Sequence, residues 1–147
     1  MTDRKTELIR EEDQAWSELH ALLDGLTPEQ MTRPGLTSDW SVKDLKGHLA
    51  SWWAEAKLEL ERMRFGTFRL ERVDLDTINR QFYEANRDLD LAIIRAELHA
   101  ARNKALEALW KLDEVTPRAE EWFLESGPLH YREHLPDLER FVKETAG

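Results

Sequence analysis

The sequence contains no cysteine, little glycine or proline, and no long uninterrupted apolar run. Without cysteine the chain has no disulfide, no thiolate metal ligand and no cysteine nucleophile. Six glycines and five prolines in 147 residues, with 35% charged residues spread among leucine, alanine and tryptophan, favour amphipathic helices over sheet or disorder. No stretch has the length of a signal peptide core or a membrane span, and the N-terminus is polar. These features predict a soluble, cytoplasmic protein.

Positively charged residues are also fewer than negatively charged ones: 21 lysines and arginines against 30 aspartates and glutamates give a net charge of −9. A chain of this charge gains nothing from counterion release at a phosphate backbone or from attraction to an anionic membrane. We therefore expect neither nucleic acid nor membrane as a partner. The length fits one domain with one core, spanning residues 1–147.

Apolar residues recur at alternating threes and fours in several segments, which predicts an all-α fold of amphipathic helices. The first three segments cover about 3–26, 41–64 and 78–112. Thr27-Pro28 predicts one extra turn after the first helix, Ser41 a capped start of the second, and Asp88 a fresh cap within the third. The fourth helix has two candidate starts, at Thr116-Pro117 or at the Gly127-Pro128 step.

The segment from Phe65 to Asp76 lacks a helical period. Its roughly 12 residues can span about 40 Å when extended, at about 3.3 Å per residue. A helix of about 24 residues, such as the second, is about 36 Å long. The segment is therefore long enough to cross a bundle from end to end, so we expect the second and third helices to run parallel.

Two histidines stand where buried apolar residues are expected. His130 and His134 share a helical stripe with Leu138 and Phe141, and His48 falls on the inward face of the second helix. Three inward imidazoles can bind one transition metal such as Zn, Ni or Fe and leave a coordination position open for water or substrate. The alternative is that carboxylates or carbonyls satisfy buried histidines without a metal.

Three further residues are candidates for catalysis beside such a metal. Asp137 follows His134 by three residues and is a candidate fourth ligand or hydrogen-bond acceptor, or else a solvated acid. Glu55 is a candidate general base or an exposed glutamate, and Tyr131 a candidate oxyanion donor or a packing residue.

The remaining histidines and the tryptophans fit structural roles. His20 and His99 lie at the margins of their stripes and are expected at the surface or an interface. The spacing of four tryptophans predicts core positions for Trp16, Trp52, Trp53 and Trp110. Trp40 precedes the Ser41 cap and is expected to pack onto the second helix, with pocket lining as the alternative.

Several of these segments resemble one family. Trp40-Ser41-Val42-Lys43-Asp44-Leu45 with His48-Leu49 and Trp52-Trp53 resembles the second-helix signature of the DinB/YfiT-like superfamily. Asp76 to Asn79, Phe82 to Arg87 and His130-Tyr131-Arg132-Glu133-His134 resemble its DfsB/ClbS branch. The resemblance implies a four-helix bundle with up-down-down-up connectivity, and a divalent metal, commonly zinc or nickel, at His48, His130 and His134.

The resemblance implies a function class but no reaction. Its members include thiol-dependent transferases and isomerases and hydrolase-like resistance proteins. We therefore expect a metal-dependent enzyme that acts on a small-molecule substrate as a hydrolase or thiol-dependent transferase. The alternatives are a non-catalytic module that sequesters a small molecule in a tryptophan-lined cavity, and a bundle that forms a homodimer through a flat face.

Overall fold

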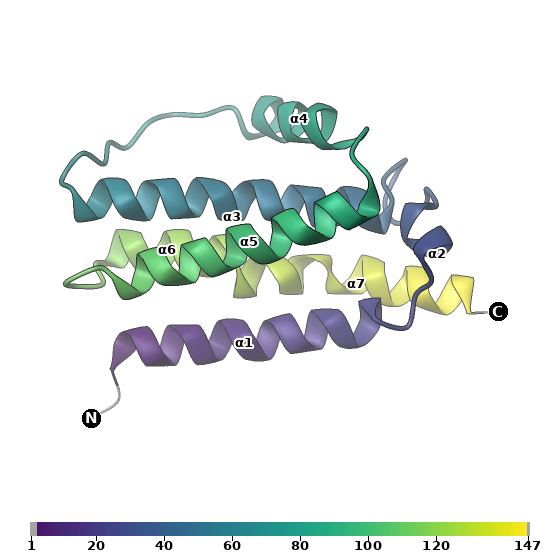
Figure 1. The fold of residues 1–147 in the computed structure, drawn as a ribbon, viewed down its shortest axis with the longest axis horizontal. Coiled ribbons are helices and arrows are strands. Elements are labelled where there is room, and N and C mark those ends of the chain that lie inside the picture. Colours follow the sequence, from purple (N-terminus) through teal and green to yellow (C-terminus); the bar gives the residue numbers. More distant parts are fainter. Residues whose placement is uncertain (1–2, 147) are drawn as a thin grey trace.

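The computed structural model describes residues 3–146, which form helices and loops but no strand. Four helical arms lie side by side, and two short helices lie in the connections between them (Figure 1). The arms are α1 (Arg4–Leu23), α3 (Val42–Arg64), α5 (Leu91–Trp110), and the consecutive pair α6 (Pro117–Ser126) and α7 (Pro128–Thr145). The connecting helices are α2 (Pro28–Thr32) and α4 (Leu75–Asn86). The all-helical fold predicted from the sequence is confirmed.

The arms have the expected up-down-down-up connectivity. In Figure 1, α1 and the α6–α7 arm run in one direction, whereas α3 and α5 both run in the other. Residues 65–74 return along the length of α3 before α4 begins, which is what allows α3 and α5 to be parallel. The most extensive packing is of α3 against α5 and of α1 against α7.

Local capping explains most of the helix starts. The Ser41 hydroxyl accepts from the backbone N–H of Asp44, whose carboxylate accepts from the backbone N–H of Ser41, and this capping box fixes the start of α3. Thr27 caps the predicted extra turn, α2, in the same way. The long third segment divides into α4 and α5, and α5 begins after Asp90 rather than at the predicted Asp88.

Both candidate starts of the fourth helix are used. The Thr116 hydroxyl caps α6, and α7 begins anew after Gly127. Gly127 lies against the ring of Trp53, and a Cβ at this position would be 2.5 Å from that ring. The close approach of the indole therefore requires glycine at the junction between the two helices. Helix α7 then continues through Pro136.

The core lies along the inner faces of the four arms. Trp53 is completely buried, and its ring lies 5.5 Å from that of Phe123. Trp110 was predicted to be a core residue, but it is 56% exposed near the end of α5, so that prediction is wrong. None of the helices formed by residues 3–146 combines the length and apolar character that a membrane crossing requires.

Candidate metal centre

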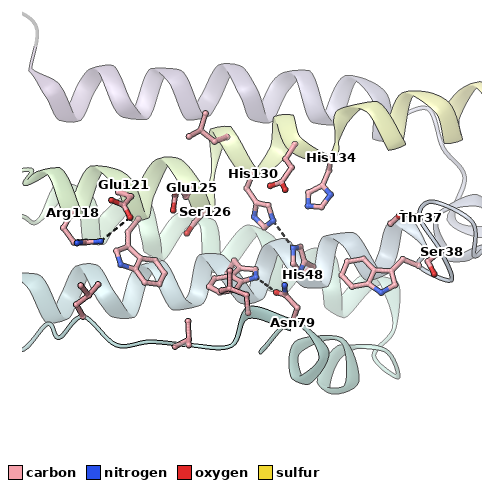
Figure 2. A pocket seen from close by; sticks show the side chains of 18 residues that line it. Thr37, Ser38, His48, Asn79, Arg118, Glu121, Glu125, Ser126, His130 and His134 are labelled. Atoms are coloured by element: carbon pink, nitrogen blue, oxygen red, sulfur yellow. Dashed lines mark hydrogen bonds and ion pairs between the residues drawn. The ribbon is translucent and has the colours of Figure 1, made fainter. Parts of the chain in front are cut away.

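Three histidines from two helices meet inside the bundle. His48 lies on α3, and His130 and His134 lie one turn apart on α7 (Figure 2). The Nε2 atoms of His48 and His130 are 2.9 Å apart, and one ring nitrogen from each of the three side chains lies within 4.8 Å of the others. His48 and His130 are only 9% and 8% exposed. The three-histidine cluster that the sequence predicts is therefore present.

The protein environment keeps these rings neutral at ordinary pH. Burial, together with the neighbouring imidazoles, lowers the pKa of His48 to about 4 and that of His130 to about 3. Burial also lowers the pKa of His134, although the charges of Glu133 and Asp137 oppose that shift. Neutral imidazole is the form that binds a metal, so the cluster does not need to lose protons before an ion can bind.

The rings also have unused bonding capacity. The Nδ1 atoms of His48 and His130 and the Nε2 atom of His134 are buried without a hydrogen-bond partner. The backbone of Ser126 counteracts the lowering of the pKa of His130, but the Nδ1 atom of that ring makes no hydrogen bond. Two nitrogens bound to one tetrahedral metal ion lie about 3.3 Å apart, because each bond is about 2.0–2.1 Å long. The donor atoms, their neutral state and their spacing therefore fit a divalent transition metal.

The cluster forms part of the wall of a large pocket. The pocket has a volume of about 890 Å³ and lies between α3, α6, α7 and the extended segment of residues 65–74 (Figure 2). Leu70 and Val73 of that segment line the pocket and are 72% and 54% exposed. Trp52 and Trp122 contribute an aromatic wall, with ring centroids 6.5 Å apart. This size and lining suit a small organic molecule.

Helix α4 is held against the pocket by polar and aromatic contacts. The Nε1–H of Trp52 donates to Oδ1 of Asn79 at 2.8 Å. The ring of Trp40 stacks on Tyr83, with centroids 5.8 Å apart, and packs edge-to-face against His48, with centroids 5.2 Å apart. Trp40 therefore lines the pocket, which was the alternative interpretation of this residue.

The two predicted catalytic carboxylates lie outside the wall of this pocket. Glu55 lines a separate groove between α3 and α5, together with Glu97 and Lys104, and the structure separates it from the three histidines. Asp137 is close enough to His134 to affect its pKa, but it belongs neither to the pocket wall nor to the group of potential metal ligands.

The third predicted catalytic residue, Tyr131, is completely buried and points away from the pocket into a polar network. Its hydroxyl donates to Oε2 of Glu12 at 2.8 Å and accepts from Nε1–H of Trp53 at 2.7 Å. Arg102 binds both carboxylate oxygens of Glu12, each at 2.7 Å. Burial and the carboxylate of Glu12 raise the pKa of Tyr131 well above its usual value, so the phenol remains a donor. Tyr131 thus connects α7 to α1 and α3.

Sequence reasoning missed this network, although a signal for it exists. Glu12 occupies the inward stripe of α1 that also includes Leu8, Ala15 and Leu19, and it is fully buried. A carboxylate at a core position requires a buried cation or several donors, as a histidine does. The spacing alone could not identify Arg102, since this partner lies 90 residues away in the sequence.

Fold and site together define a helical bundle of the DinB-like type with a three-histidine group that can hold a metal. The chain belongs to the family of the mycothiol maleylpyruvate isomerase N-terminal domain, whose model matches residues 13–139. Its fold is similar to that of an uncharacterised protein from Escherichia coli UTI89, with a TM-score of 0.80 and 18% sequence identity over 97% of this chain and 94% of that one. No curated protein matches the chain.

Proposed function

We propose that this protein is a metal-dependent enzyme that acts on a small organic molecule as a hydrolase or a thiol-dependent transferase. The observation that carries the proposal is the position of three neutral, incompletely hydrogen-bonded imidazoles in the wall of a pocket of about 890 Å³. Structural histidines are normally paired with other acceptors and donors, whereas here the Nε2 atoms of His48 and His130 face only each other, and one nitrogen of each of the three rings lies within 4.8 Å of the others, as three ligands of one ion would.

His48, His130 and His134 hold the ion in this proposal. When bound, a divalent metal with three protein ligands supplies Lewis acidity to whatever occupies its open position. The Nε2 atoms of His48 and His130 face each other at 2.9 Å, and His134 lies one turn further along α7, so an ion between the rings would lie within reach of all three side chains. Trp40 packs against His48, and Trp52 lines the same pocket.

The reaction class rests on similarity. The family is named after a mycothiol maleylpyruvate isomerase, and mycothiol is a thiol, which supports chemistry on a thiol or thioether. The segments at residues 76–87 and 130–134 resemble the DfsB/ClbS branch, which supports hydrolase-like chemistry instead. We therefore propose membership of that branch together with one of these two reaction types.

Metal analysis of protein purified without an affinity tag tests the metal site. We expect about one divalent ion per chain in the wild type after loading and dialysis, and a large loss in His130→Ala or His134→Ala. His99→Ala is the matched control, because His99 is exposed on α5 and does not line the pocket. Equal metal content in wild type, both site variants and the control would refute the ligand assignment.

A second candidate function is non-catalytic sequestration of a small apolar molecule, favoured by the tryptophans that line the pocket. Trp40, Trp52 and Trp122 should then report ligand binding by a change in fluorescence. If a ligand quenches this fluorescence equally with zinc and with a chelator, and the protein does not convert the ligand, sequestration is favoured over the enzyme. Binding that requires the metal would favour the enzyme.

A further inference from the structure

The charged side chains in the pocket wall are mostly acidic. Arg118, Glu121, Glu125 and Glu133 line the pocket, so three carboxylates face one guanidinium. Arg118 already binds Glu121, with Nη1 and Oε1 3.3 Å apart, and each neutralises the other (Figure 2). Among the described residues of the wall there is no second cationic side chain. Glu125 and Glu133 are thus the two carboxylates without a counter-charge in this wall.

These two carboxylates stand beside aromatic and unsatisfied polar groups. Glu125, Leu129 and Glu133 succeed one another at intervals of four residues along the pocket side of the α6–α7 arm. Trp122 precedes Glu125 by three residues, so an indole ring and a carboxylate border the same part of the pocket. The buried ring of His130, with its unpartnered Nδ1 atom, forms part of the same wall.

This combination favours a positively charged ligand. Aromatic faces attract ammonium and guanidinium groups, and a carboxylate without a partner adds a direct counter-charge. An anionic ligand would find no free cation among the described side chains of the wall and would face Glu125 and Glu133. A divalent metal at the histidines would repel a cation nearby, so the charged end of the ligand belongs toward Glu125 and Trp122.

We propose that the pocket takes an amphipathic organic cation, with an apolar or aromatic body along Trp52 and Trp122 and a protonated amine or amidine at Glu125, while Glu133 adds to the negative charge of the same wall. This inference rests on the proposed function only for the claim that the ligand is a substrate. The charge preference itself belongs to the pocket and does not require a bound metal.

Calorimetric titration of the metal-free protein with three probes of equal length tests the charge preference. The probes are phenylbutylamine, phenylbutanol and phenylbutyrate, which are cationic, neutral and anionic at neutral pH. We expect the amine to bind about fivefold more tightly than the alcohol and the carboxylate to bind weakest, which is the scale that two partly exposed charge pairs supply. The double variant Glu125→Gln/Glu133→Gln should lower the preference for the amine at least twofold.

A control variant separates the pocket from the overall charge. Glu114→Gln/Glu139→Gln removes the same two charges from exposed positions outside the pocket and should keep the full preference. The proposal is overturned if the amine binds no better than the alcohol, if none of the probes binds at millimolar concentration, or if the control loses as much preference as the pocket variant.

Zinc binding measured on the same wild-type preparation reports separately on the metal site. Tight zinc binding without a preference for the amine would refute the cationic ligand and leave the metal proposal standing. A preference for the amine without zinc binding would support the cationic ligand and refute the metal site.

Discussion

Replacing Tyr131 by phenylalanine tests whether this residue is a structural link rather than a catalytic donor. The change removes one hydroxyl and leaves the ring, which is fully buried. The Nε1–H of Trp53 then loses its acceptor in a fully buried position, at a cost of about 1–3 kcal/mol. The carboxylate of Glu12 loses one donor, worth about 1.5–3 kcal/mol, but keeps both bonds to Arg102.

These two losses share one hydroxyl, so we expect a total of about 2–4 kcal/mol rather than their full sum. For a chain of this size that corresponds to a fall of about 4–16 °C in Tm, at about 2–4 °C per kcal/mol. Urea unfolding followed by circular dichroism gives the free energy directly. Tyr83→Phe is the matched control, because Tyr83 is the other tyrosine of the chain and has no hydrogen bond from its hydroxyl to any described residue.

The reasoning is refuted if Tyr131→Phe unfolds within about 0.5 kcal/mol of Tyr83→Phe, which is the scale of an ordinary surface change. Metal content provides an independent readout. Because the Tyr131 hydroxyl points to Glu12 and not to the pocket, the folded variant should bind as much metal as the wild type. A Tyr131→Phe protein that is stable but has lost its metal would contradict this structural role.

Three other predictions follow from the same geometry. Gly127→Ala should destabilise the protein by about 1–3 kcal/mol in urea unfolding, because the added Cβ would overlap the ring of Trp53. Gly25 has open space around it, so Gly25→Ala should not destabilise the protein in this way. Burial depresses the pKa of His48 and His130, so in metal-free protein the unfolded chain binds more protons than the folded one below pH 6.5. The unfolding free energy should therefore fall as the pH drops from about 6.5 to about 4, by about 1.4 kcal/mol per pH unit for each ring. A pH-independent urea midpoint would contradict this prediction. Zinc at about one hundred times its dissociation constant should raise the unfolding free energy by about 2.7 kcal/mol, measured as an increase in Tm that a chelator reverses; no shift would count against a site in the folded state.

Most helix positions were predictable because their causes are local. The Ser41 capping box, the Thr27-Pro28 turn and the Thr116 cap each depend on residues within one helical turn, and all three are present. The parallel arrangement of α3 and α5 was also predictable, since the length of an extended segment limits where the next helix can begin. Trp110 was misplaced because periodicity identifies a face but not whether a neighbour covers it.

The candidate metal centre was predictable in part. Two histidines at helical spacing on an apolar face, with a third on another inward face, indicate convergence, and the three rings do converge. The candidates Glu55, Tyr131 and Asp137 were chosen by distance along the chain from these histidines. The structure places none of them in the pocket wall, because the spacing along one helix does not tell which other elements pack against each part of it.

The sequence by itself determined the helices, their caps, the long crossover and the stripe on which the histidines lie, because each of these depends on interactions between residues a few positions apart or on the length of the chain. Only the tertiary structure decided that Glu12 joins Arg102 and Tyr131, that Trp40 and Trp122 border one pocket, and that Glu125 and Glu133 are left there without a counter-charge. The physical reason is that pairing and desolvation depend on which faces of distant helices meet, and that is set by the packing of the whole bundle.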